Sequence, residues 1–470
     1  MMKKILIFAV VLSLLVPAAA FAATEFTLGG YIKLDSYWDS TQNGAYMNSP
    51  VPRNNDPNGQ HGNFRMTAMG SRFNFTIKGP DVLGAKLTGF LEMDFENNAS
   101  ETGVSTGAGT FSTSNPYTPR LRHAMFRLNW PGDTELMFGQ YWSLFADWTP
   151  EVAQDGPFLA VGDPSGYRLP QIRFTQGFMD GAGGHWSLAG AIADPQFIEG
   201  TSADPYNTGY TSGNASATPQ LNGQVKYQAD LWGKAAYYGH PMGFTAEVTG
   251  GWQRNVSRTT YNDSLTNYQG FSSTATWANT YLQPWEIQGS LFIPIIPTHT
   301  DNLAGTMHFI AVPFIGQDLY AFGLSGDGTN VFKYDANFSN RGHAVNEECL
   351  RQYGAYGELQ YYFTNQWYAN AAYGFTKYET NTGWEYFYTS PYAQTKDQQE
   401  VDATLWWRPI AALKFGLQYS YVHTDYLTNA YFTQAGVESQ NPIASASGNS
   451  GSPSKMGDEH RVEFVGYFYF

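Results

Sequence analysis

The chain has 470 residues, of which 26 are Lys or Arg and 40 are Asp or Glu, so its formal net charge is −14. This acidity argues against a nucleic-acid partner, because nucleic acids are bound by basic surfaces. The single cysteine, Cys349, excludes an internal disulfide framework. It is either a reactive thiol or an incidental loop residue.

Residues 1–22 predict a signal peptide. Two lysines precede an apolar run, and Ala20 and Ala22 fit a cleavage site of small residues. The run is shorter than the roughly 18 residues that a spanning helix needs. We therefore expect an exported chain, and because no later apolar run is long enough to span, its route into a bilayer would be a closed β-barrel.

Strict alternation of apolar and polar residues starts early in the mature chain. Residues 72–78 read RFNFTIK, and a tight turn joins them to residues 86–96, KLTGFLEMDFE. In the second of these segments Leu91 and Met93 are expected to point outward. Its inward face would hold three acids, Glu92, Asp94 and Glu96.

The next segment, residues 120–130, has ambiguous faces. Its apolar side chains are those of Ala124, Phe126, Leu128 and Trp130. If they form the outer face, Arg127 points inward, while Arg120 and Arg122 lie outside or above the membrane.

The pattern continues to the C-terminus, giving about 16 strands joined by alternating short turns and long segments, as transmembrane barrels require. The long segments are rich in Gly, Ser, Asn, Asp and Thr, and the chain ends in RVEFVGYFYF. There Phe468 and Phe470 share a face suited to an aromatic girdle at a membrane surface. Residues 23–470 are thus predicted to be all-β: a transmembrane antiparallel β-barrel of about 16 strands, with short periplasmic turns and long extracellular loops.

A soluble β-sandwich, propeller or solenoid would also show short strands and turns. A sandwich does not alternate short and long connections systematically, and it does not need aromatic residues at its strand ends. The sequence also lacks a fixed-period repeat of the propeller kind.

The quoted segments resemble a family. SRFNFTIKGPDVLGAKLTGFLEMDF resembles the early hairpin of Gram-negative trimeric outer-membrane porins, and LRHAMFRLNWPGDTELMFGQYW resembles the hairpin ahead of their constriction loop. EVDATLWWRPIAALKFGLQYSYVHTDY resembles the DcaP-like branch. Two departures stand out: Gly139-Gln140 occupies a place where many porins have Gly-Arg, and the first expected strand follows the signal segment without a coiled-coil arm.

The resemblance implies a porin that lets ions and small hydrophilic solutes diffuse passively across the outer membrane. It implies a homotrimer in contact with outer-membrane lipid and lipopolysaccharide, and recognition of Phe470 by the barrel-assembly machinery. It also implies that residues 142–167 fold inward as a constriction loop. No cofactor is implied.

A barrel of this size encloses an aqueous channel, whose lining charges select what passes. The excess of acids suggests a weak cation preference. Three acids on one strand face repel one another, so a cation or nearby arginines must relieve them. The expected pore-lining and constriction residues are Arg72, Lys78, Lys86, Glu92, Asp94, Glu96, Asp147, Glu151, Asp155, Asp163, Arg168 and Arg173.

Other functions remain open at this point. They include a substrate-specific porin for sugar, phosphate or dicarboxylate, the sheath of a porin–cytochrome conduit, a receptor or adhesin, and an outer-membrane hydrolase. The sequence has no metal-ligand spacing, nucleophile elbow, phosphate loop or haem motif. We therefore predict no enzymatic activity, no catalytic residue and no metal.

Overall fold

The structure is a computed structural model. It describes residues 24–41, 51–54, 57–96, 119–146, 148–153, 167–196, 213–262, 275–323, 330–334, 344–349, 351–379, 395–426, 454 and 456–470. The predicted signal peptide lies outside these residues.

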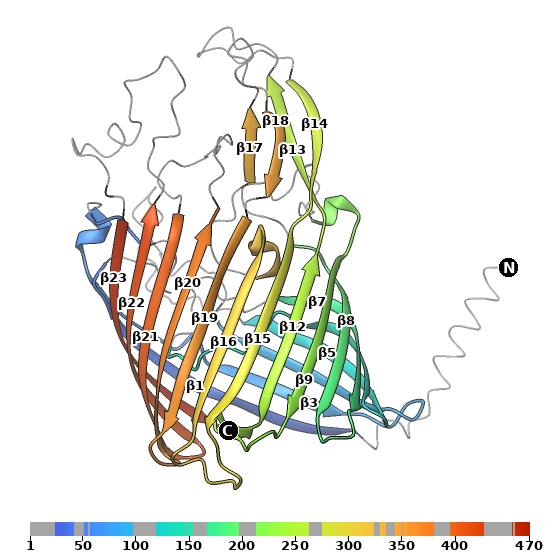
Figure 1. The fold of residues 1–470 in the computed structure, drawn as a ribbon, viewed down its shortest axis with the longest axis vertical. Coiled ribbons are helices and arrows are strands. Elements are labelled where there is room, and N and C mark those ends of the chain that lie inside the picture. The colour runs from blue at the N-terminus through green and yellow to red at the C-terminus, as the bar shows by residue number, and fades with distance from the viewer. Residues whose placement is uncertain are drawn as a thin grey trace, which may run out of the picture.

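Sixteen antiparallel strands close into a barrel (Figure 1). Closure is made by β1 and β23, which pair from Tyr31 with Tyr469 to Asp39 with Arg461. Around the wall the strands are β1 (Glu25–Asp39), β3 (Arg72–Lys78), β4 (Lys86–Asp94), β5 (Arg120–Trp130), β6 (Thr134–Trp142), β7 (Arg168–Met179), β8 (His185–Ala193), β9 (Gln220–Ala229), β12 (Phe244–Trp252), β15 (Trp285–Ile296), β16 (Met307–Gln317), β19 (Arg351–Tyr362), β20 (Trp367–Tyr378), β21 (Thr395–Ile410), β22 (Leu413–Tyr426) and β23 (Met456–Tyr469).

A short strand, β2 (Asn63–Thr67), pairs with one half of β1 while β3 pairs with the other half, so β2 and β3 form one interrupted wall strand. Outside the wall, three small hairpins and three short helices are described. They are β10 (Ala235–Tyr237) with β11 (His240–Met242), β13 (Asn255–Asn262) with β14 (Ala275–Leu282), β17 (Asn330–Tyr334) with β18 (Ala344–Cys349), η2 (Pro57–Gln60), η3 (Asn214–Ser216) and η4 (Leu319–Phe322).

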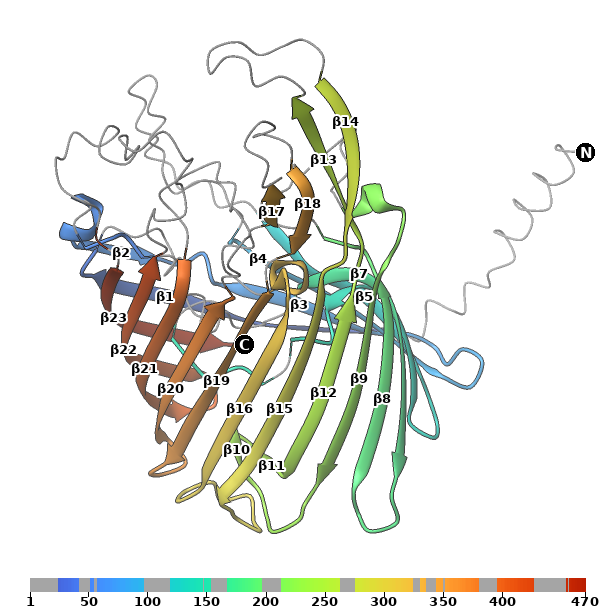
Figure 2. The same cartoon turned by 45° about the horizontal axis from the view of Figure 1, so that its top comes forward.

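Short and long connections lie at opposite ends of the barrel. The short turns and the C-terminus lie at the lower end in Figure 1, and the hairpins β13–β14 and β17–β18 rise from the upper end. We call these the short-turn end and the long-loop end. Figure 2, tilted toward the viewer, shows β3 and β4 across the barrel from β15 to β20.

Side chains alternate between an apolar outside and a polar inside. In β1 the outward Ile32 and Leu34 are 58% and 41% exposed, whereas the inward Lys33 and Asp35 are 0% and 3% exposed. Exposed apolar side chains on a closed barrel face lipid, so the predicted transmembrane barrel is confirmed. In the part of the chain that the structure describes, no helix has the length and apolar character needed to cross a membrane.

One part of the inner surface is apolar instead of polar. Ile310, Val312 and Phe314 of β16 face inward and are buried, together with Phe292 of β15. Because apolar side chains in a water-filled lumen would be costly, something must cover them. Two segments do so: the loop between β6 and β7, and the β10–β11 hairpin.

Candidate functional site

A β-bulge in β5 organises the charged wall of the lumen. The β4–β5 register shifts so that His123 lies opposite Glu92 and Leu121 opposite Met93, which leaves Arg122 as the extra residue. Arg122 and His123 both point inward and are buried. A bulge exchanges the inner and outer faces of the residues beyond it.

The bulge corrects the expectation for residues 120–130. Leu121 before it and Phe126 after it both point outward and are each 46% exposed. Arg120 and Arg122 accordingly face the lumen, where they bind acids of β4. The prediction that these two arginines lie outside was wrong, because it assumed an unbroken two-residue period.

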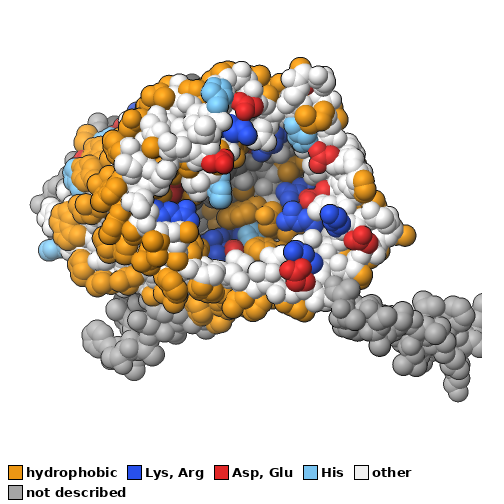
Figure 3. Space-filling model, turned by 90° about the horizontal axis from the view of Figure 1, so that it is seen from below, with side chains coloured by type: hydrophobic (Ala, Val, Ile, Leu, Met, Phe, Trp, Pro, Cys, Tyr) orange, Lys and Arg blue, Asp and Glu red, His pale blue; other side chains and the backbone are white. Residues whose placement is uncertain are grey.

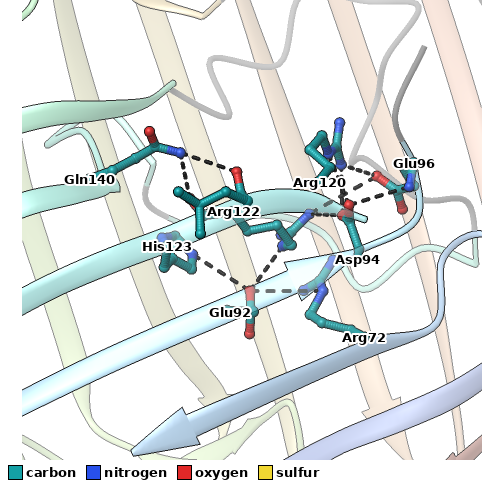
Figure 4. A network of polar contacts seen from close by, with 9 residues as sticks. Arg72, Glu92, Asp94, Glu96, Arg120, Arg122, His123 and Gln140 are labelled. Carbon is teal, nitrogen blue, oxygen red and sulfur yellow. Dashed lines mark hydrogen bonds and ion pairs between the residues drawn. The ribbon is translucent and has the colours of Figure 1, made fainter. Parts of the chain in front are cut away.

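The neighbouring strand β6 is shaped to fit the bulge. Gly139 has φ +118°, and a Cβ there would lie 2.3 Å from the carbonyl oxygen of Ala124. Gln140 Nε2 donates hydrogen bonds to the carbonyl oxygens of Leu121 and Arg122, at 3.2 and 3.0 Å (Figure 4). The Gly139-Gln140 pair, which departs from the porin pattern, therefore satisfies backbone groups that the bulge removes from the ladder.

The three acids of β4 are neutralised by arginines. Arg120 contacts Asp94 at 2.6 Å and also binds Glu96. Arg122 Nε lies 2.9 Å from Glu92 Oε1, and its Nη1 lies 2.7 Å from Asp94 Oδ2 (Figure 4). Repulsion among carboxylates on one strand face is thus relieved by charge-assisted hydrogen bonds from guanidinium groups.

Further arginines lie over aromatic rings of β6. The ring of Tyr141 lies 5.6 Å from the guanidinium of Arg127 and 5.5 Å from that of Arg173. The ring of Trp142 lies 4.7 Å from the guanidinium of Arg168. These are cation–π distances, so the rings position the guanidinium groups without cancelling their charge.

We call these basic residues the arginine wall: Arg72, Arg120, Arg122, Arg127, Arg168 and Arg173. The acids bound to them are Glu92, Asp94, Glu96 and Glu135. Asp94 lies deeper than Arg120, since its side chain is 0% exposed, against 31% for the arginine. Arg122 is itself buried, at 5%, beside Glu92 at 10%. Seen from the short-turn end, the barrel is hollow, and both basic and acidic side chains lie around the opening (Figure 3).

The loop between β6 and β7, residues 142–167, enters the lumen in its described part; we call it the inward loop. Its Glu151 is buried against the wall of β19 to β22. The carboxylate forms an ion pair with Lys414 and accepts hydrogen bonds from Tyr368 Oη at 2.7 Å and Gln360 Nε2 at 2.8 Å. Glu151 was expected among the constriction charges, but it faces protein and fastens the loop instead.

Burial and neighbouring charge shift the pKa of Glu151 in opposite directions. Burial favours the neutral acid, but the Lys414 ammonium and the hydroxyl and amide donors outweigh it and hold the pKa of Glu151 below its usual value. The backbone adds further attachments, because the Glu151 carbonyl accepts from Asn370 at 2.9 Å and from Trp406 at 3.1 Å. At neutral pH Glu151 is therefore ionised, and its contacts fix it to the barrel wall.

The other expected residues lie elsewhere. Lys78 and Lys86 are exposed at the short-turn end, where Lys78 Nζ lies 3.2 Å from Glu25. Lys78 is about 20 Å along β3 from Arg72, at about 3.4 Å for each residue. Both lysines lie nearer to Arg127, because Thr88 pairs with both Lys78 and Arg127. Asp147, Asp155 and Asp163 lie outside the described residues. Cys349 is buried beside Phe145 of the inward loop.

Sequence reasoning missed the basic residues of the adjoining strands β1 and β23, which also bind acids. Arg461 Nε lies 2.6 Å from Asp39 Oδ1, and Lys33 Nζ lies 2.8 Å from Asp35 Oδ1. Alternation alone would have placed all four side chains in the lumen, since each shares a strand face with polar neighbours. What the alternation does not give is which strands are neighbours across the closing seam.

Comparison with known proteins supports the fold. The outer membrane channel DcaP of Acinetobacter baumannii aligns with a TM-score of 0.60 at 14% identity, covering 96% of this chain and 98% of DcaP. An anion-selective porin from Comamonas acidovorans aligns at 0.49 with 12% identity, covering 95% and 100%. The trimer form of OmpT, an outer membrane protein of Vibrio cholerae, aligns at 0.49 with 9% identity, also covering 95% and 100%.

No protein-family model matches the sequence, and no curated protein matches it. The likeness to DcaP shows a shared fold, a closed antiparallel β-barrel of sixteen strands.

Proposed function

We propose that this protein is an outer-membrane channel through which ions and small hydrophilic solutes diffuse passively, with no chemical step. The observation that supports this most is the hollow barrel with a charged inner wall (Figure 3). A barrel of sixteen strands is too wide for side chains alone to fill, and charges that line an aqueous passage select its solutes. Lipid and lipopolysaccharide would contact the apolar outer surface.

Liposome swelling tests the proposal. The purified protein is reconstituted into liposomes, which are diluted into isotonic solutions of uncharged sugars of increasing size. A channel predicts fast swelling with small sugars and progressively slower swelling with larger ones. Liposomes that contain correctly folded protein and do not swell with any sugar would contradict it.

Two observations favour opposite ion preferences. The acidic composition predicted a weak cation preference. The arginine wall favours the opposite, because Arg72, Arg120 and Arg127 are more exposed than the carboxylates that they contact, while Arg122 is as buried as its partners. A reversal potential in a salt gradient separates the two, and we expect preference for anions if the solute path follows this wall.

Two alternatives predict different transport behaviour. A substrate-specific porin for sugar, phosphate or dicarboxylate would show saturable flux, whereas a general channel would not. The sheath of a porin–cytochrome conduit would purify with a haem protein and would not conduct ions in its company. Receptor, adhesin and hydrolase functions each predict a barrel without conductance.

We also propose a homotrimer, which the sequence resemblance implies, and recognition of Phe470 during assembly. Phe470 is half exposed at the short-turn end, on the outer surface of the barrel beside Phe468. Sedimentation of the detergent-solubilised protein tests the trimer. Deletion of Phe470 should reduce the amount of barrel in the outer membrane without changing the conductance of the molecules that do assemble.

A further inference from the structure

A second segment, besides the inward loop, enters the lumen. The turn between β9 and β12 is longer than a two-residue turn would need to be, since Ala229 and Phe244 are direct register partners. The chain between them forms the β10–β11 hairpin, which packs against β15 and β16. We call it the inward hairpin.

The inward hairpin and the inward loop share two apolar clusters inside the barrel. Ala235 of the hairpin and Trp148 of the loop belong to the cluster on β15, β16 and β19. Ala236 of the hairpin and Ala153 of the loop belong to the cluster that includes Trp406 of β21. The hairpin is also held on β16 by a polar contact, since His308 Nδ1 lies 2.5 Å from the carbonyl oxygen of Ala236.

Two adjacent tyrosines connect the hairpin directly to the loop. The Tyr237 ring lies 5.0 Å from the ring of Trp148. The Tyr238 hydroxyl donates to the Pro150 carbonyl oxygen at 3.2 Å and lies 3.3 Å from Thr149 Oγ1. These contacts hold the loop on the side nearer the short-turn end, just before Glu151.

The backbone conformation of Tyr238 indicates that its contact with the loop has a function. Tyr238 has φ +49°, in the left-handed region, and Gly239 follows with φ +80°. A left-handed conformation costs an ordinary residue about 1–2 kcal/mol, and turns of this kind normally use Asn or Gly. A strained tyrosine whose hydroxyl meets the loop indicates that the ring was kept for this contact.

We propose that the inward hairpin, through Tyr237 and Tyr238, is a positioning element that holds the inward loop against the β15–β22 side and thereby sets the width of the channel. The proposal rests on the channel function above and adds to it the element that determines the size limit. With the hairpin in place, one half of the lumen is filled and the open path lies along the arginine wall. Without it, the loop has one support fewer and the path widens.

The test uses three variants in a Cys349→Ser background. In the first, residues 230–243 are replaced by the dipeptide Asn-Gly, a two-residue turn suited to directly paired strands. The second is Tyr238→Phe, which keeps the ring and removes the hydroxyl. The matched control is Tyr227→Phe, which removes a hydroxyl that bonds Asp180 and does not touch the loop.

Two readouts are measured on each variant: single-channel conductance, and the mobility of a nitroxide label at Val152→Cys in the inward loop. We expect the hairpin replacement to raise conductance about twofold, since pore width limits ion flow, and to give the label a narrower, more mobile spectrum. Tyr238→Phe should mobilise the label with a smaller rise in conductance. The control should change neither.

The outcomes separate the two proposals. If the unmodified protein does not conduct, the channel function fails, and label mobility alone then decides whether the hairpin holds the loop. If the hairpin replacement does not fold, Tyr238→Phe decides by the same two readouts. Unchanged conductance and unchanged label mobility in the folded variants would overturn the positioning role.

Discussion

The side-chain amide of Gln140 lies 3.0 Å from the backbone carbonyl oxygen of Arg122. Through this contact β6 supports the bulge that turns Arg122 into the lumen beside Arg120. The charge pattern of the wall therefore depends on a glutamine that carries no charge.

Replacing Gln140 by leucine should destabilise the barrel and loosen the bulge. Two carbonyl oxygens lose their donor, and a hydrogen bond contributes about 0.5–1.5 kcal/mol to stability. Urea unfolding in detergent, followed by tryptophan fluorescence, measures the loss. Gln176→Leu is the control, because Gln176 also donates to two carbonyl oxygens but lies where the strand register is regular. A larger loss for the control than for Gln140 would contradict the account.

Arg122→Gln should move ion preference toward cations. Arg122 binds both Glu92 and Asp94, so its removal leaves carboxylate charge uncompensated in the lumen. Removing one partner of a buried ion pair also destabilises a protein by about 3–5 kcal/mol. The reversal potential in a salt gradient checks the first effect, and thermal unfolding checks the second.

Lys78→Met serves as the comparison for Arg122→Gln. Lys78 and Glu25 form an exposed pair at the short-turn end, and such pairs contribute about 0–1 kcal/mol. We expect a small change in stability and in reversal potential. Equal shifts for both variants would mean that total charge, and not the arginine wall, sets ion preference.

Arg173→Gln should reduce anion preference with little loss of stability. Arg173, a member of the arginine wall, lies over Tyr141, and a cation–π contact contributes about 0.5–2 kcal/mol. The measurement is the permeability ratio of chloride to potassium, compared with that of the unmodified channel. An unchanged ratio would place the solute path away from Arg173.

Acidification should release the inward loop. The pKa of Glu151 is held below its usual value, so its pairing stabilises the fold above the unfolded glutamate pKa of about 4.3 and is lost as pH falls through the lower folded value. Because a released loop widens the path, open-channel conductance should rise as pH falls below the unfolded glutamate value. In Glu151→Gln the conductance should be raised already at neutral pH and nearly independent of acid.

Strands β3 to β5 show which side-chain directions the sequence predicts and which it does not. The residues of β3 and β4 alternate without interruption, so their faces and the inward direction of Glu92 were predictable from a period of two. In β5 one inserted residue reverses the faces, and a bulge leaves no composition signal of its own. Gly139 was visible, but its purpose needs the partner strand.

The sequence also gives only a partial signal that one half of the lumen is filled with protein. The inner face of β16 is as apolar as its outer face, so the sequence TMHFIAVPFI breaks the polar–apolar alternation expected of a channel wall. That break indicates a cover without saying what provides it. The direction of Glu151 could not be read either, because it depends on Lys414, which is far away in the chain.

The central claim is that the barrel is an open channel whose solute path follows the arginine wall. Single-channel recording of the purified protein in a planar bilayer, across a salt gradient, tests it most directly. The account predicts discrete conductance steps and a reversal potential that shows preference for anions, shifted toward cations in Arg122→Gln. Silence from a folded, reconstituted barrel, or a reversal potential that Arg122→Gln does not change, would contradict it.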